Sequence, residues 1–184
     1  SDLVPDPNAG IAQAEKPERV VIDYSAPNVA KQMHVGHLRS TIIGDCFNRV
    51  LSAQGHTVIP QNHIGDWGTQ FGMLIEYIVE KRMDVDDFDL SGVEQLYQDS
   101  KKTFDADPQF ADRARRRVVK LQGGDAETLR IWRTLIDISL EGFNATYARL
   151  SVLLPDEDVA GESSYNDYLP RVVDARVADG RAVG

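Results

Sequence analysis

The sequence predicts an α/β fold in which a small parallel sheet carries a helical insertion. Two observations support this prediction. The first is a strand, a helix and a second strand within about forty residues, which is the order of a βαβ unit in a parallel sheet. The second is the run of helical patterns that begins at Thr69 and continues through most of the remaining chain.

The predicted βαβ unit occupies residues 19–62. Three consecutive apolar residues within 19–24 indicate a buried strand, and residues 56–62 form the second strand. Between them a helix over 36–54 is predicted by apolar residues in two rows at four-residue spacing, and Gly55 is placed to end it. The rows are Leu38, Ile42, Cys46 and Val50, with Ile43, Phe47 and Leu51 beside them.

Three further helices are expected between about residues 91 and 150, and each has its own start signal. Ser91 and Glu94 have the spacing of a capping box. Asp107 is followed by a proline, which is typical of an N-cap and first helical turn. Two glycines then precede the third start at Asp125.

The last part of the chain predicts a possible third strand over 152–154, a polar loop over 155–164 and a helix over 165–179 that Gly180 closes. Residues 1–18 are expected to be a linker, and residues 19–184 one partial domain with its helical insertion at about 91–150.

Composition restricts the class of protein. With 42% hydrophobic residues, the 184-residue chain can bury one core. It has no run long enough to cross a membrane and no secretory signal, so we expect a cytoplasmic protein. The single cysteine, Cys46, excludes an intrachain disulfide.

A net charge of −9 argues against nucleic-acid binding by the whole surface. One basic stretch runs from Arg113 to Lys120, and the favoured interpretation is a solvated face that balances the acidic residues 84–89.

The segment over residues 23–37 carries the chemistry. It leaves the first strand and enters a helix, and open α/β sheets bind ligands at this place. His34 and His37 are three apart and can face the same side of the first turn, and Gly36 between them lets a phosphate approach the backbone. Lys31 adds a cation nearby. Together with the free N–H groups of a helix start, these residues suit reaction at the α-phosphate of a nucleotide.

The histidine pair has two other interpretations. The histidines could be metal ligands, but no further ligand stands at a zinc-enzyme spacing, so no metal site is expected. They could also be simple helix caps if the pair stood alone.

The surrounding residues extend the motif. Ser25-Ala26-Pro27-Asn28 together with His34-Val35-Gly36-His37-Leu38-Arg39-Ser40-Thr41 resembles the first signature of class I aminoacyl-tRNA synthetases, in the form found in bacterial arginyl-tRNA synthetases. Further matches lie at residues 62–72, 110–115, 118–122 and 161–166. The resemblance implies a partial Rossmann-type sheet of the HIGH-type nucleotidylyl transferase fold, over residues 20–184.

The resemblance also implies roles for residues that match the family's motifs. The catalytic set is Lys31, His34 and His37, and the ATP-binding set is His34, Gly36 and His37. The arginine-binding set is Asp23, Ser25, Asn28 and Glu162, where Glu162 pairs with the guanidinium. The residues His63, Asp66 and Gln70 are expected to line the same cleft, whereas Trp67 is expected in the core.

The implied activity is ligation of L-arginine to tRNA(Arg) with ATP and Mg as substrate. The family's later signature and tRNA-binding domains are not matched, so we expect a monomeric segment of a longer protein that is inactive alone and reaches tRNA through domains absent from this chain. Two alternatives remain open: another H-x-G-H nucleotidyltransferase, and a non-catalytic binding module.

Overall fold

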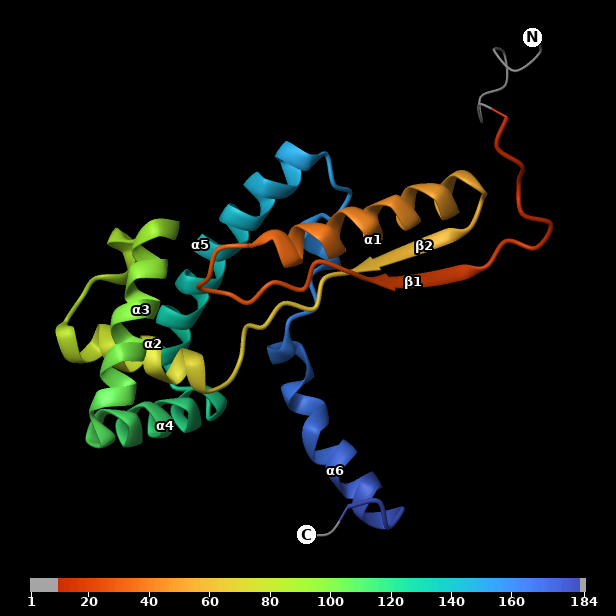
Figure 1. Cartoon of the computed structure of the whole chain (residues 1–184). Coiled ribbons are helices and arrows are strands. Elements are labelled where there is room, and N and C mark those ends of the chain that lie inside the picture. The colour runs from red at the N-terminus through yellow and green to blue at the C-terminus, as the bar shows by residue number, and fades with distance from the viewer. Residues whose placement is uncertain (1–9, 183–184) are drawn as a thin grey trace.

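The computed structural model describes residues 10–182 and contains the predicted βαβ unit. Strands β1 (Arg19–Asp23) and β2 (Thr57–Gln61) pair in parallel, with Arg19 opposite Thr57 and Asp23 opposite Gln61. Helix α1 (Val35–Ala53) connects them and lies along the sheet (Figure 1). Both strands point their carboxyl ends toward the helical part of the molecule. The parallel strand pair joined by a helix confirms the α/β fold class.

The buried face of α1 is its small and polar side. Thr41, Gly44, Asp45 and Asn48 are buried, and a Cβ built at Gly44 would lie 2.3 Å from the side chain of Tyr24. The helix therefore packs closely on the end of β1. The two apolar rows that predicted the helix lie mainly on the other side, where Phe47 is 56% exposed.

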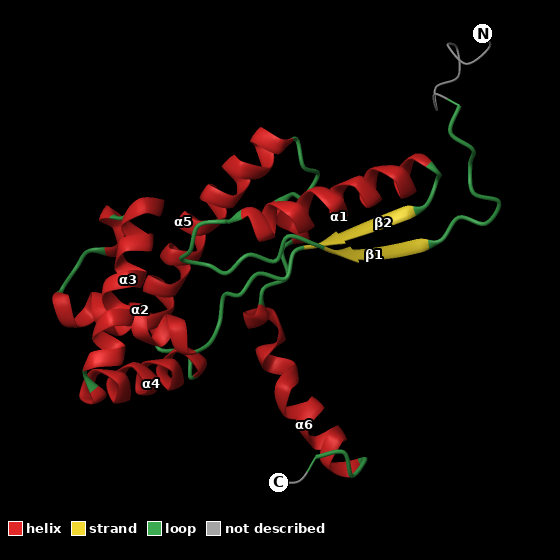
Figure 2. Cartoon of the chain, viewed as in Figure 1, coloured by secondary structure: helices red, strands yellow, loops and turns green. Residues whose placement is uncertain are grey.

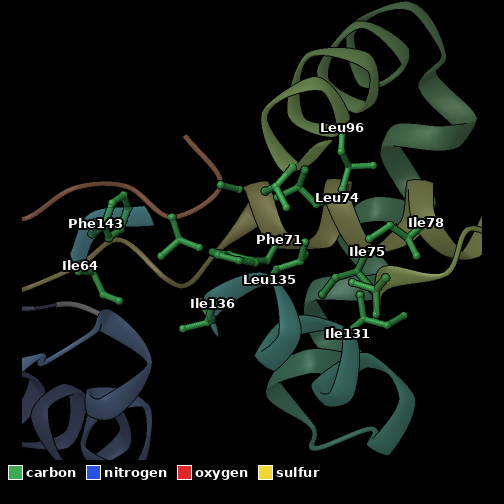
Figure 3. Packing of buried hydrophobic residues seen from close by; sticks show 14 of the residues in the cluster. Ile64, Phe71, Leu74, Ile75, Ile78, Leu96, Ile131, Leu135, Ile136 and Phe143 are labelled. Carbon is green, nitrogen blue, oxygen red and sulfur yellow. The ribbon is translucent and has the colours of Figure 1, made fainter. Parts of the chain in front are cut away.

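Four helices form the helical part: α2 (Thr69–Lys81), α3 (Leu90–Ala106), α4 (Pro108–Gln122) and α5 (Ala126–Leu150). Helices α2 and α4 approach closely, because a Cβ at Gly72 would lie 2.3 Å from the carbonyl oxygen of Ala114. Figure 3 shows the core where α2 and α5 meet, with Phe71 and Leu135 fully buried. The cluster continues to Ile64 and Phe143, so the helical part and the loops after the strands share one core.

Two of the three predicted helix starts are confirmed. Asp107 caps α4 by accepting the N–H of Gln109, and Asp125 caps α5 by accepting the N–H of Thr128. The start at Ser91 was wrong. Asp89 is the N-cap of α3, and its carboxylate accepts the N–H of Gly92 at 2.8 Å. A carboxylate two residues earlier offers a strong acceptor to the same turn.

The predicted strand over 152–154 is wrong (Figure 2). Side chains from elsewhere in the chain bond the backbone N–H and carbonyl groups of this segment, which a neighbouring strand would otherwise bond. The N–H of Leu153 donates to Asp45 at 2.7 Å, and its carbonyl accepts the hydroxyl of Tyr24 at 2.8 Å. The chain instead reaches the sheet region further on, where Val159 forms an isolated parallel bridge with Asn62.

The predicted last helix is shorter than expected. A 3-10 helix at Asp156–Asp158 and another at Glu162–Tyr168 precede α6 (Leu169–Ala178), and Gly180 follows with φ of 67°. Helix α6 extends away from the rest of the chain (Figure 1). No helix within residues 10–182 is long and apolar enough to cross a membrane.

Half of the expected linker, residues 1–9, lies outside the described residues. The rest runs beside the end of α1, where Ala14 donates its N–H to the Gln54 carbonyl at 2.9 Å and the Gln13 amide donates to Ala53 at 2.8 Å. Thr57 at the start of β2 also donates to the carbonyl of Glu18. Residues 13–18 are therefore hydrogen-bonded to the βαβ unit.

Candidate functional site

Three chain segments meet beyond the carboxyl ends of β1 and β2: residues 25–29, 62–66 and 158–163. The first two run in parallel, because Val29 donates to the Gly65 carbonyl and Gly65 donates to the Pro27 carbonyl, both at 3.1 Å. The third runs beside the second, where Glu162 donates its N–H to Ile64 at 3.2 Å. These loops lie between the sheet and the helical part (Figure 2), at the sheet edge where α/β proteins bind ligands.

Side chains of helix α5 support these loops by hydrogen bonds. The hydroxyl of Tyr147 is 2.6 Å from Ser25 Oγ and accepts Asn62 Nδ2 at 3.2 Å. Eight residues earlier in α5, about two helical turns away, Ser139 Oγ accepts the N–H of Ala30 at 3.1 Å. Burial raises the pKa of Tyr147, so the phenol stays protonated and can donate to Ser25.

The first loop is strained. Ser25, Ala26 and Ala30 have φ of 74°, 48° and 61°, a left-handed region that costs non-glycine residues on the order of 1 kcal/mol each. Each is held by a side chain from another part of the chain: Ser25 by Tyr147, Ala26 by the side-chain Oδ1 of Asn62 and Ala30 by Ser139. Strain of this kind clusters where a loop must keep one shape for a ligand.

His34 and His37 form a capping box at the start of α1. His34 Nδ1 accepts the N–H of Gly36 at 3.1 Å, and His37 Nδ1 accepts the N–H of His34 at 3.2 Å. Because both Nδ1 atoms are acceptors, each neutral ring carries its proton on Nε2. Burial lowers the pKa of His37, and His34 lowers it further, so the neutral form prevails at pH 7. The first turn holds no acidic residue, which favours an anion there.

The His34 ring lies so close to the backbone of residue 36 that only glycine fits there. A Cβ at this position would lie 2.8 Å from His34 Cε1. The structure places Lys31 Nζ 4.5 Å from the centre of the Tyr97 ring on α3.

The other predicted site residues fall into two groups. Asp23 at the end of β1 is exposed, as are the loop residues Asn28, His63 and Glu162. The ring centroids of His63 and Tyr165 are 6.0 Å apart. Ser25, Asp66 and Gln70 instead use their side chains inside the protein, where they bond Tyr147, Ser163 and the Gly65 carbonyl.

Three hydroxyl residues that support the loops have no role predicted from the sequence: Ser139, Tyr147 and Ser163. Their partners are distant in sequence, so no local pattern indicates these contacts. Trp67 packs against the core as expected, with its ring edge-on to Trp132.

The basic stretch on α4 is mostly paired, though with other partners than the acidic residues 84–89. Arg117 binds Glu76 at 2.9 Å, Arg113 binds Glu76 and Glu80, and Arg115 binds Asp112. The partners lie mainly on α2, so this surface is charge-balanced by a neighbouring helix. Among residues 10–182 no group of three or more His, Cys, Asp or Glu side chains could hold a metal ion.

Comparison with known proteins gives a consistent result. Residues 2–183 match the family described as tRNA synthetases class I (R), catalytic domain. The chain is 95% identical over 183 residues to an arginine–tRNA ligase of Cutibacterium acnes, covering 100% of this chain and 33% of that protein. It is 50% identical over 177 residues to the ligase of Laribacter hongkongensis, covering 96% of this chain and 31% of that protein.

A solved structure, the arginyl-tRNA synthetase of Plasmodium falciparum, superposes with a TM-score of 0.69 at 37% identity. The superposition covers 85% of this chain and 26% of the solved chain. The chain thus spans about a third of the length of the curated relatives it matches.

Proposed function

Because this chain belongs to the catalytic-domain family of class I arginyl-tRNA synthetases, we propose that it forms one side of a site that activates L-arginine with ATP and transfers it to tRNA(Arg). In the first step the arginine carboxylate attacks the α-phosphate of ATP, arginyl-adenylate forms and pyrophosphate leaves. Mg enters with ATP as part of the substrate. The family match also sets aside the alternative of an unrelated H-x-G-H nucleotidyltransferase.

The histidine capping box is the observation that carries this proposal. Negative charge builds up on the phosphates as the new bond forms, and a donor held in place beforehand stabilises that charge by about 3 to 4 kcal/mol. His34 and His37 offer such donors at Nε2, because backbone N–H groups fix both rings through Nδ1. The free N–H groups of the α1 start face the same anion. Lys31 would leave Tyr97 and join the phosphates.

For arginine we assign exposed polar residues at the end of β1 and in two of the loops. Asp23 and Asn28 hold the α-amino and carboxylate end, and Glu162 takes the guanidinium, which a carboxylate can bind through two parallel hydrogen bonds. The Glu162 side chain makes no hydrogen bond or ion pair within residues 10–182, so it is available to a ligand. Ser25 contributes through the loop shape that its bond to Tyr147 maintains, Gln70 holds Gly65, and His63 lies at the rim.

The remaining parts of the proposal concern the longer protein. We propose a monomer that works in the cytoplasm, where ATP, arginine and tRNA are all present, and that holds tRNA through domains outside this chain. The paired basic stretch on α4 supports a minor role for this chain in tRNA binding, since phosphate contacts need unpaired cations.

The test is arginine-dependent exchange of labelled pyrophosphate into ATP, with and without tRNA. It compares this chain alone with a full-length protein, which contains this chain and has the length of the curated relatives. We expect exchange by the full-length protein, and a rate at least about a thousandfold lower for the chain alone, because the loss of several charge-stabilising donors costs more than 4 kcal/mol.

In the full-length protein, His34→Asn with His37→Asn should reduce the exchange rate, whereas Cys46→Ser on the exposed face of α1 should not. Absence of exchange in the full-length protein would instead favour the alternative of a non-catalytic binding module.

A further inference from the structure

Asp66 is a buried carboxylate with an unusual set of partners. It is 4% exposed and forms no ion pair within residues 10–182. Its Oδ1 accepts the backbone N–H of Ser163 at 2.9 Å, and its Oδ2 accepts the Ser163 hydroxyl. Burying a charge is costly unless hydrogen bonds compensate for the lost water, so these two bonds hold Asp66 and Ser163 together.

Gly161 brings the same loop against Asp66 from the other side of Glu162. A Cβ at Gly161 would lie 2.3 Å from Asp66 Oδ2 and 2.6 Å from its Cγ, so only glycine allows this approach. The N–H of Glu162 itself donates to the Ile64 carbonyl at 3.2 Å. The backbone around Glu162 is thus bonded to Asp66 through Ser163 and to Ile64 through the Glu162 N–H, and Gly161 packs against Asp66.

Asp66 is in turn fixed to the helical part. The indole N–H of Trp132 on α5 donates to the Asp66 carbonyl at 2.8 Å, and the Trp132 ring meets Trp67 edge-on with centroids 5.6 Å apart. The position of Glu162 is therefore set relative to α5, which also holds the strained loop of Ser25 through Tyr147.

We propose that Asp66 is a positioning residue that fixes the backbone from which the exposed Glu162 side chain extends, and that this placement lets the Glu162 carboxylate select a guanidinium over an ammonium ion. The proposal rests on the proposed function of Glu162. Two parallel hydrogen bonds to a planar guanidinium require the carboxylate in one plane, whereas an ammonium ion binds from many directions. Loss of Asp66 should therefore weaken arginine more than lysine, without Asp66 touching either substrate.

The experiment measures pyrophosphate exchange with a protein that carries this chain at the full length of its relatives. For Asp66→Ala we expect KM for arginine to rise at least about tenfold and the preference for arginine over lysine to fall by a similar factor, while KM for ATP stays within about twofold. Asp66→Asn keeps an acceptor for the Ser163 N–H and can donate to its hydroxyl, so it should remain within about threefold of wild type for all three quantities.

Asp45→Ala is the matched control. Asp45 is also a buried carboxylate that accepts a backbone N–H, that of Leu153 at 2.7 Å, but it lies on α1. The Asp45→Ala variant should lower thermal stability as Asp66→Ala does, but it should leave the preference for arginine over lysine unchanged. If Asp66→Ala is too unstable to assay, Ser163→Ala removes one of the two bonds and should give a smaller shift in the same direction.

Glu162→Gln separates this proposal from the function on which it rests. A large loss of arginine affinity in Glu162→Gln, with Asp66→Ala and Ser163→Ala like the Asp45 control, would overturn the positioning role alone. Unchanged arginine affinity in Glu162→Gln would overturn the assignment of Glu162 to the guanidinium.

Discussion

The imidazole rings of His34 and His37 stand with centroids 3.9 Å apart and planes tilted by 33°, and each ring accepts a backbone N–H of the first turn of α1. The two side chains thus cap the helix and support each other. Since Nδ1 is used in both rings, Nε2 is the nitrogen that a ligand would meet. A capping role and a phosphate-binding role are therefore compatible here and need not compete.

The first prediction concerns the titration of His37. Burial lowers its pKa from the ordinary value of 6.5 and His34 lowers it further, so His34→Asn should raise the pKa of His37 partway toward 6.5. Asparagine keeps an acceptor at the N-cap, which preserves the helix start. The pKa values follow from NMR titration of the imidazole signals in the chain. An unchanged His37 pKa in the variant would show that the rings are not coupled.

The same shift gives a sign for stability. Because the folded state binds a proton at His37 less readily than the unfolded chain, unfolding becomes easier as pH falls from 6.5 toward the lower folded pKa. Above pH 6.5 this contribution is fully present. His37→Asn should lack this part of the pH dependence, as measured by urea unfolding across the same range.

The second prediction concerns Gly36. In Gly36→Val the new side chain forces the His34 ring off its cap, since a Cβ alone would lie 2.8 Å from Cε1. The lost cap costs about 1 kcal/mol, so the chain should still fold. ATP affinity should fall at least about tenfold, because both the backbone approach and one donor are disturbed.

Calorimetric titration of the full-length protein with ATP measures this loss. Val35→Ala at the adjacent, 81% exposed position is the control and should bind like wild type. Equal ATP affinity in Gly36→Val would contradict the proposed place of the phosphates.

Local signals explain which parts of the fold could be predicted. Asp107 and Asp125 are the real N-caps because each bonds an N–H two or three residues later, a relation visible in sequence. The supposed strand over 152–154 failed because Asp45 and Tyr24, more than a hundred residues away, take its polar groups.

The candidate site also has one part that the sequence could predict and one part that it could not. The motif over 34–37 is contiguous, so its residue types and spacing indicate an anion site. The left-handed φ of Ala26 and Ala30 has no sequence signal, since alanine rarely adopts it. It arises from contacts with Asn62 and Ser139, which only the tertiary structure brings near.

The third prediction tests the support of that loop. Tyr147→Phe removes the hydroxyl that Ser25 and Asn62 share, and leaving buried polar groups without a partner should cost about 2 kcal/mol of unfolding free energy. Tyr77→Phe is the control, because the half-buried Tyr77 makes no side-chain hydrogen bond within residues 10–182, and it should change stability by less than about 0.5 kcal/mol. Urea unfolding of the chain, followed by circular dichroism, compares them. Similar losses in both variants would mean that the shared hydroxyl does not hold the loop.

The fourth prediction concerns the ion pair between Arg117 and Glu76, whose side chains are only 8% and 11% exposed. Arg117→Leu leaves Glu76 buried with a single cation, Arg113, at 3.4 Å, and removes a donor to Thr128. Breaking a buried pair from one side costs about 3 to 5 kcal/mol, and the remaining Arg113 places the expected loss near 3 kcal/mol.

Replacing both partners, Glu76→Leu with Arg117→Leu, should restore most of this loss, because no buried charge then lacks its partner. Arg115→Leu provides the matched control on the same helix, where an exposed pair with Asp112 should contribute less than about 1 kcal/mol. Urea unfolding measures the free energy of unfolding of the wild-type chain, the two single variants and the double variant. If Arg117→Leu costs no more than Arg115→Leu, the contact between α2 and α4 depends on the apolar packing around Gly72 and Ala114, and the buried pair adds little to it.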